Sequence, residues 1–308
     1  MKIYDVAFLG MGASALATAK LKYKGTSISL IGIDKNYHSK RNNFFAFWLT
    51  DWMKDFDSLA QKKWFCWNFY LTNNHIKHET KDLPYCTIRY QDWKNYCLKG
   101  LENLSIKEFN VQSITNLKKY YEIKLENGEE IFAKKIYDSR TPKLENEKVK
   151  QHFFGYLIET KQMINSNSVT LMDFRVEQKM GLHFMYCLPI DENRMLVEST
   201  VFSSEIQEDD WYQKQILEYI ETKLKLSEYK IVDEEKGALP MYDIENKSSE
   251  NYINIGSRGG ATKISTGYAF SFFLKNIMFN FENINKAHHS YFDKWMDKVF
   301  VNFLKNNS

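Results

Sequence analysis

The chain has 308 residues, of which 44% are hydrophobic and 26% charged, which excludes intrinsic disorder and collagen-like or low-complexity architectures and favours two intertwined domains. The formal net charge of +3 is too small to indicate a nucleic-acid partner, although it allows an anionic ligand or a membrane surface. The aromatic share of 16% is enough to line a core or the walls of an apolar ligand tunnel.

The first predicted elements are a strand, a glycine turn, a helix and a second strand. Residues 4–9 and 28–33 are apolar runs typical of parallel strands that are buried on both faces. Between them, Ala13–Tyr23 contains helix-forming residues. Together these segments predict a βαβ unit with a right-handed crossover.

The rest of the chain is predicted to alternate short strands with a few helices. An aromatic region at 43–70 precedes a helix at 90–101, and the charged residues 141–150 are interpreted as a linker. The other predicted elements are strands at 105–114, 119–125, 131–137, 153–160, 182–188, 194–202, 229–235 and 252–255, and helices at 209–226 and 283–306.

Six of the 13 glycines fall in two short segments, each between a predicted strand and a predicted helix. The first segment has the G-x-G-x-x-A form of the dinucleotide-binding fingerprint, which places a pyrophosphate at a helix N-terminus. Asp34 ends the second predicted strand, where an acidic side chain binds the adenosine ribose. The predicted cofactor-binding residues here are Gly10, Gly12, Ala13, Ser14, Ala15 and Asp34.

The second segment contains Gly256, Gly259 and Gly260, followed by Thr266 and Gly267. FAD is long enough to need both segments, with its pyrophosphate at one and its ribityl chain and isoalloxazine ring at the other. We therefore predict FAD rather than NAD as the cofactor. We also predict that backbone N–H groups around Gly259, Gly260, Thr266 and Gly267 face the flavin and favour its anionic form.

The sequence also indicates a compartment. The four cysteines show no Cys-x-x-Cys spacing, so we expect reduced thiols in a cytoplasmic protein. The first residues lack a signal-peptide pattern, and no run reaches the roughly 18–20 apolar residues needed to cross a bilayer, which leaves peripheral membrane contact open. His75 and His78 have no further ligands nearby, so no metal site is expected.

Five stretches, in order, resemble those of the lycopene cyclase family of flavoproteins. They are residues 4–15, NFFAFWLTDW at 43–52, QHFFGY at 151–156, LMDF and FMYCLPIDENRMLVEST within 171–202, and GALPM and IGSRGGATKISTGY within 237–268. The chain departs from the family at Lys263, where a more apolar or proline-containing turn is usual.

The resemblance implies a fold and an activity. The fold is α/β, with a Rossmann-type FAD-binding domain like that of glutathione reductase and a β-rich substrate domain. We expect residues 1–145 and 245–308 to form the FAD-binding domain and residues 146–244 the substrate domain. Members of this family bind reduced FAD, usually reduced by NAD(P)H, and isomerise a polyene end without net redox change.

Glu198 is the predicted acid–base residue. Strand alternation places Leu196, Glu198 and Thr200 on one face, and a carboxyl group in so apolar a strand has a raised pKa. The resemblance places an acidic residue essential for activity at the same position. The alternative is that Glu198 faces solvent from a half-buried sheet.

Several other side chains are candidates for binding. Trp48, Phe184 and Tyr186 could wall the substrate or simply pack in the core. Arg89 could pair with the FAD phosphates or lie on the surface. Related flavoproteins imply that Val111 places backbone against the adenine, and apolar packing is the alternative.

These observations predict an enzyme: a flavin-dependent, net redox-neutral cyclase or isomerase acting on an apolar polyene or isoprenoid end. One alternative is a flavin monooxygenase or reductase acting on an aromatic or isoprenoid substrate, which would consume NAD(P)H in step with product. The other is a non-catalytic protein that binds flavin and polyene.

Overall fold

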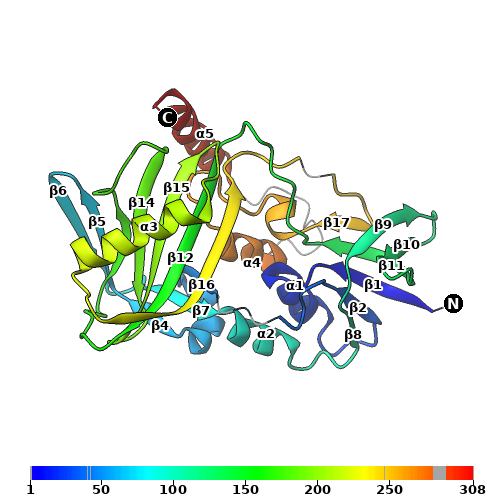
Figure 1. The fold of residues 1–308 in the computed structure, drawn as a ribbon. Helices are drawn as coiled ribbons and strands as arrows, with labels where there is room; N and C mark the ends of the chain where they lie inside the picture. The colour runs from blue at the N-terminus through cyan, green and yellow to red at the C-terminus, as the bar shows by residue number, and fades with distance from the viewer. Residues whose placement is uncertain (1, 40, 42, 246, 280–288, 308) are drawn as a thin grey trace.

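A computed structural model describes every residue of the chain except 1, 40, 42, 246, 280–288 and 308 (Figure 1). Its described strands form three sheets, two of seven strands and one of three. The two large sheets lie at opposite ends of the molecule, and helices α1 and α4 lie between them (Figure 1).

The first sheet is mainly parallel, in the order β8-β2-β1-β11-β10-β9, with β17 beside β11. β1 pairs in parallel with β2 on one side and with β11 on the other, as in a Rossmann-type domain. The strands are β1 (Ile3–Leu9), β2 (Leu30–Ile33), β8 (Leu104–Lys107), β9 (Val111–Asn116), β10 (Tyr121–Leu125), β11 (Glu130–Asp138) and β17 (Tyr252–Asn254).

Both faces of this sheet are covered, because alternate residues of β1 are buried on opposite sides. Val6 and Phe8 belong to the core beneath helices α1 (Ala13–Tyr23), α2 (Tyr90–Leu98) and α4 (Phe270–Phe279). Ala7 and Leu9 belong to a second core that includes apolar residues of β10 and β11. The apolar runs of the sequence are therefore strands buried on both faces, as predicted.

The second seven-stranded sheet has the order β16-β12-β15-β14-β13-β5-β6. Helix α3 (Asp209–Tyr219), extended by a π-helical turn over Ile220–Leu224, packs on the face that bears Val197 and Val201. The opposite face therefore bears Glu198. The strands are β5 (Cys66–Leu71), β6 (Asn74–Glu79), β12 (Lys150–Thr160), β13 (Val169–Asp173), β14 (Leu182–Pro189), β15 (Arg194–Ser203) and β16 (Tyr229–Pro240).

The aromatic region contributes to two sheets. β3 (Phe44–Trp48), β4 (Lys62–Trp64) and β7 (Tyr85–Arg89) form the three-stranded sheet, with the 3₁₀ helix Asp51–Leu59 between β3 and β4. β5 and β6 leave it and pair with β13 in the second large sheet. Residues 66–79, which we expected within the first FAD-binding segment, thus extend the sheet of the β-rich part.

The last described elements follow β17. A short 3₁₀ helix, Gly256–Gly259, precedes α4, and α5 (Tyr291–Asn307) lies above the second large sheet (Figure 1). Leu304 of α5 is buried in a cluster with Phe184 and Phe202 of that sheet. Among the described helices, none is long and apolar enough to cross a membrane.

Two predicted elements differ from the structure. The single strand expected at 105–114 is two strands, β8 and β9, at opposite edges of the first sheet, because Asn110 turns the chain by hydrogen bonding to Glu126. The helix expected at 283–306 begins at Tyr291 in the described part, and residues 283–288 lie outside the described residues.

Candidate functional site

The first glycine segment forms the turn between β1 and α1. Gly10 has a φ of +76°, which glycine adopts without strain, and a Cβ there would lie 3.2 Å from the backbone nitrogen of Arg140. Gly12 caps α1, and the space that its Cβ would occupy is open. Ala15 is fully buried, so the helix lies close to the sheet. Gly10 and Gly12 thus place no side chain before Ala13 and Ser14 at the start of α1, where the fingerprint seats a pyrophosphate.

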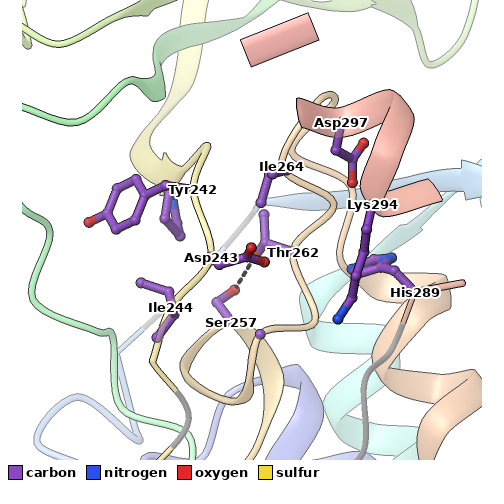
Figure 2. Close-up of a pocket in the computed structure, with 11 residues that line it drawn as sticks. Tyr242, Asp243, Ile244, Ser257, Thr262, Ile264, His289, Lys294 and Asp297 are labelled. Atoms are coloured by element: carbon purple, nitrogen blue, oxygen red, sulfur yellow. Dashed lines mark hydrogen bonds between the residues drawn. The ribbon is translucent and has the colours of Figure 1, made fainter. Parts of the chain in front are cut away.

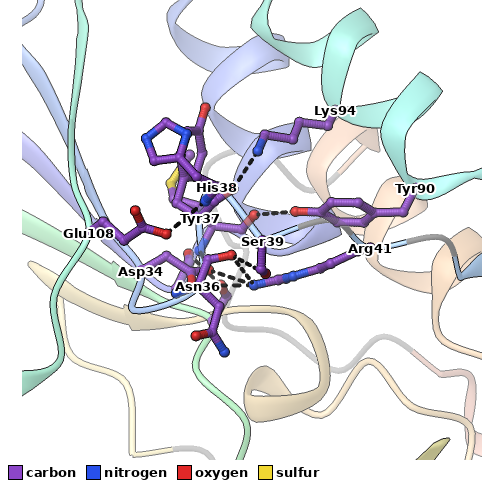
Figure 3. Close-up of polar contacts among 12 residues, drawn as sticks. Asp34, Asn36, Tyr37, His38, Ser39, Arg41, Tyr90, Lys94 and Glu108 are labelled. Atoms are coloured by element: carbon purple, nitrogen blue, oxygen red, sulfur yellow. Dashed lines mark hydrogen bonds and ion pairs between the residues drawn. The ribbon is translucent and has the colours of Figure 1, made fainter. Parts of the chain in front are cut away.

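Asp34 follows β2, and its carboxylate lies beside Arg41 (Figure 3). Its carboxylate accepts a 2.8 Å hydrogen bond from the backbone N–H of Met11. Arg41 pairs with this carboxylate at 3.3 Å, and its guanidinium lies 5.2 Å from the centre of the Tyr90 ring. The sequence analysis did not select Arg41, because nothing in its spacing distinguishes it from a surface arginine.

The second glycine segment packs directly on the first. Gly256 has a φ of +62°, and a Cβ there would overlap the hydroxyl oxygen of Ser14 in the first turn of α1. Arg258, in the same 3₁₀ helix, pairs at 3.1 Å with the buried carboxylate of Asp138 at the end of β11. Gly260 has a φ of +82° and open space beside it. The two segments therefore meet, as one shared cofactor requires.

The backbone N–H groups of this segment do not have the role that we predicted. Each is already used in a turn: Gly259 donates to Ile255 at 3.3 Å, Gly260 to Ser257 at 3.1 Å, and Thr266 and Gly267 to Lys263 at 3.1 and 2.8 Å. A donor engaged by a carbonyl of its own chain is not available to a charge on a ligand. The prediction that these four N–H groups stabilise an anionic flavin is therefore wrong.

Two buried polar atoms beside Gly267 lack hydrogen-bond partners in the described structure. They are the hydroxyl oxygen of Thr266 and the side-chain oxygen of Gln151. Gly267 has a φ of +73°, and a Cβ there would overlap this same oxygen of Gln151. Because a buried polar atom without a partner is unfavourable, this place fits the polar edge of a cofactor. The residues present thus fit FAD.

A small pocket of about 40 Å³ adjoins the second glycine segment (Figure 2). Ser257 and Gly260 line it together with Asp297 of α5. Lys263, which departs from the family pattern, pairs with Asp297 at 2.9 Å and so ties this segment to α5. The pocket has room for a few water molecules but not for a dinucleotide.

Glu198 lies on the face of the second sheet opposite α3 and is only 7% exposed. Its carboxylate accepts a 2.5 Å hydrogen bond from the hydroxyl of Thr200, two residues along the same face. Tyr186 of β14 is its direct cross-strand neighbour on one side, and Gly155 of β12 on the other. The alternative in which Glu198 faces solvent is thereby excluded.

Three tyrosine hydroxyls connect Glu198 and its cross-strand neighbours to the second glycine segment. The hydroxyl of Tyr85 in β7 lies 2.7 Å from that of Tyr186 and 3.0 Å from that of Tyr268, the residue after Gly267. The ring of Trp48 lies 4.8 Å from Tyr85 and 5.3 Å from Tyr268. Trp48, Tyr186 and Tyr268 are half-buried, so each of these residues retains some accessible surface.

The other predicted residues lie further away. Phe184 shares the face of Tyr186 but packs with Phe202 in the cluster beneath α5. Val111 packs at the edge of the core on the first sheet, which supports the packing alternative. Arg89 ends β7 at the N-cap of α2, opposite Phe44. The structure thus brings Trp48, Tyr186 and Glu198 together, and the contacts to phosphate and adenine stay predictions.

Burial controls the protonation of this site. Removal from water raises the pKa of Glu198, and the nearby carboxyl of Glu235 raises it further, while the Thr200 hydroxyl acts in the opposite direction. Burial also raises the pKa of Tyr85 and Tyr186 well above the ordinary value and that of Tyr268 to about 12. At neutral pH the site therefore holds three neutral tyrosines and a carboxyl group that favours its protonated form.

Similar solved structures define the fold as that of FAD-binding Rossmann-type flavoenzymes. A geranylgeranyl bacteriochlorophyll reductase-like protein from Thermoplasma acidophilum has a TM-score of 0.68 and 10% identity, with 99% of this chain and 84% of that chain covered. A variant of the halogenase PltM in complex with FAD has a TM-score of 0.61 and 11% identity, with 99% and 71% covered.

The family model for the lycopene cyclase protein matches residues 5–289, and the chain belongs to this family. Among individual proteins, a chloroplastic neoxanthin synthase from Solanum tuberosum is 23% identical over 298 residues, which is 86% of this chain. The chain spans 57% of the length of that relative.

Proposed function

We propose that the protein binds FAD through its two glycine segments. The contact of Gly256 with Ser14, the open space at Gly12 and the unpartnered oxygens of Thr266 and Gln151 support this. Asp34, which is paired with Arg41, would bind the adenosine ribose, and the turn at Gly10 and Gly12 would hold the pyrophosphate. When bound and reduced, with NAD(P)H as the reductant, the flavin would supply negative charge to the site.

The reaction proposed for this site is a redox-neutral cyclisation or isomerisation of an apolar polyene or isoprenoid end. The observation that carries it is the position of Glu198, a buried carboxyl group on an aromatic face that the second glycine segment also contacts. Protonation of a terminal C=C bond by Glu198 creates a carbocation, and attack by a neighbouring double bond closes a ring. The ionised Glu198 then takes a proton back from the ring, which regenerates the acid and makes product and substrate isomers.

The chain's own residues supply what this reaction needs besides the acid. A carbocation is attracted to the faces of aromatic rings, and Trp48, Tyr186 and Tyr268 present such faces. Their apolar surroundings exclude the water that would otherwise capture the cation.

Anaerobic incubation of the FAD-loaded protein with lycopene and chemically reduced flavin tests the proposal. We expect an isomeric cyclic product in the wild type and in Glu234→Gln, a control at an exposed position of β16. Glu198→Gln should retain bound FAD, measured by its absorption spectrum, and form no product. Full turnover in Glu198→Gln would contradict the assignment of the acid.

The same experiment separates the two alternatives. A monooxygenase or reductase consumes NAD(P)H in a one-to-one ratio with product, whereas the proposed isomerisation needs only enough to reduce the flavin once. A binding protein returns the polyene unchanged while its flavin stays reduced.

An apolar substrate of this kind dissolves in lipid, and we propose that α5 contacts an anionic bilayer surface. Its exposed apolar residues recur at helical spacing, and Trp295 among them is of a type enriched at lipid–water interfaces. Lys294 and Lys298 are exposed on the same helix, whereas Asp297 is buried and paired with Lys263. The apolar residues are Tyr291, Phe292, Trp295, Met296, Val299 and Phe303.

A further inference from the structure

A second carboxyl group, that of half-buried Glu235, lies across the sheet from Glu198. Gly155 of β12 is the direct cross-strand partner of Glu198 in β15 and also of Glu235 in β16. Directly opposed residues of neighbouring strands project from the same face, so both glutamates stand on the face opposite α3. Their Cα atoms are separated by two strand spacings, roughly 10 Å.

Gly155 leaves the space between the two glutamates free of a side chain. A Cβ at this position would lie 3.4 Å from Cβ and 3.5 Å from Cγ of Glu198, so the stem of Glu198 leans over Gly155 toward β16. A cavity of only about 10 Å³ adjoins Glu235, lined by Phe44 and Leu157 among others, which is scarcely room for one water molecule.

No positive charge neutralises either carboxylate: among the described residues, neither takes part in a salt bridge. The groups that act on Glu198 are the hydroxyl of Thr200 and the Glu235 carboxyl. Those that act on Glu235 are the backbone N–H of Phe44, which donates a hydrogen bond, and Asp233 on the same strand. Lys236 points to the other face, where it pairs with Asp209 of α3 at 2.6 Å.

The tyrosine side chains that face the two glutamates from adjoining elements carry no charge. Tyr186 of β14 and Tyr268 of the second glycine segment face the pair, and their raised pKa values keep both protonated. Burial raises the pKa of Glu235, as it does that of Glu198. Two neighbouring carboxyl groups that are largely removed from water, with no cation beside them, cannot both be ionised at little cost.

We propose that Glu198 and Glu235 form a single acid pair that shares one proton above Gly155, with Glu235 as the positioning residue that keeps Glu198 protonated. This inference deepens the proposed function and rests on it for its catalytic meaning. A cation beside Glu198 would favour the ionised form of its carboxyl group. Glu235 instead places a negative charge there, which favours the protonated form. Glu198, ionised once it has protonated the substrate, then accepts the proton lost from the ring, and the pair returns to its starting state.

Infrared difference spectroscopy of the FAD-loaded protein across pH tests the proposal without any polyene. In the wild type we expect the carbonyl band of a protonated carboxyl group, which disappears as the pH rises. In Glu235→Gln the midpoint pH of this loss should be lower by about one pH unit or more. Glu235→Ala should shift it in the same direction, which covers the case that Glu235→Gln does not fold. Glu234→Gln, one residue away and exposed, should leave the midpoint unchanged.

An unchanged midpoint in both Glu235 variants, or an equal shift in Glu234→Gln, would overturn the acid pair. The pH profile of turnover supplies a second readout: its fall toward alkaline pH should begin at lower pH in Glu235→Gln. Because the infrared band needs no turnover, absence of product with a shifted midpoint would reject the proposed function and leave the pair intact.

Discussion

Gly256 contacts Ser14 so closely that a Cβ at position 256 would overlap the Ser14 hydroxyl oxygen. The contact joins the second glycine segment, near the C-terminal end of the chain, to the first turn of the first helix. It fixes the relation between the two segments on which the proposed FAD site depends.

Gly256→Ala is expected to weaken both folding and FAD binding. A left-handed alanine alone costs about 1–2 kcal/mol of unfolding free energy, and overlap with the Ser14 hydroxyl adds to this. Gly128→Ala is the matched control, because Gly128 has a φ of +84° in a remote hairpin with open space around it. Urea denaturation and FAD titration should show a larger loss at Gly256, partly restored by adding Ser14→Ala. Equal stability losses with unchanged FAD affinity would contradict this account.

Tyr85→Phe should lower turnover without removing FAD. The change leaves the hydroxyls of Tyr186 and Tyr268 without their shared partner and costs about 1–3 kcal/mol of unfolding free energy. Because these rings line the Glu198 face, we expect at least a roughly tenfold fall in cyclic product, about 1.4 kcal/mol in the barrier.

Tyr23→Phe is the control for this change, since its hydroxyl pairs with that of Tyr137 at 3.2 Å in the Rossmann-type domain. It should lower stability and leave turnover per bound FAD unchanged. Equal turnover in Tyr85→Phe and Tyr23→Phe would show that the linked hydroxyls of Tyr85, Tyr186 and Tyr268 have no role in the reaction.

The raised pKa of Glu198 predicts a specific dependence of stability on pH. Above the ordinary glutamate pKa of 4.5, the unfolded chain releases this proton while the folded protein holds it, so wild-type stability declines as pH rises. Glu198→Gln cannot ionise and escapes this decline. Its free energy of unfolding relative to wild type should therefore increase between pH 5 and 8, by more than about 1.4 kcal/mol, the equivalent of one pKa unit. Parallel urea-denaturation series for the two proteins would exclude a buried, protonated Glu198.

Replacement of Phe292, Trp295 and Phe303 by serine should release the protein from lipid. These side chains are 66%, 52% and 57% exposed, so the change should leave the fold intact. We expect the wild type to float with phosphatidylserine-containing vesicles at low salt and the triple variant to remain in the soluble fraction. Wild-type protein that does not float would contradict the lipid contact.

The cofactor fold could be predicted from the sequence because its signals are local. The glycine turn, α1 and Asp34 follow one another within about thirty residues, and α1 begins and ends at the predicted residues. The face of the sheet on which Glu198 lies could also be predicted from the sequence, because alternation within one strand decides it.

The rest of the site depends on pairings between distant segments. Glu235 is one of three consecutive acidic residues, and only the register of β16 against Gly155 distinguishes it from exposed Glu234. The hydrogen bond of Tyr85 to Tyr268 joins residues 183 positions apart. The misassigned N–H groups of the glycine segment illustrate the same limit, because which carbonyl receives each of them is set by the folded turn.

Because β5 and β6 pair within the second large sheet, they decide which fragments of this protein can fold alone. Residues 146–244, cut out as a fragment, would lack the strand that pairs with the outer edge of β13. Exposed backbone along that edge recruits strands from other molecules. Expression of this piece alone should give aggregates, and a soluble excised unit has to carry residues 66–79 with it.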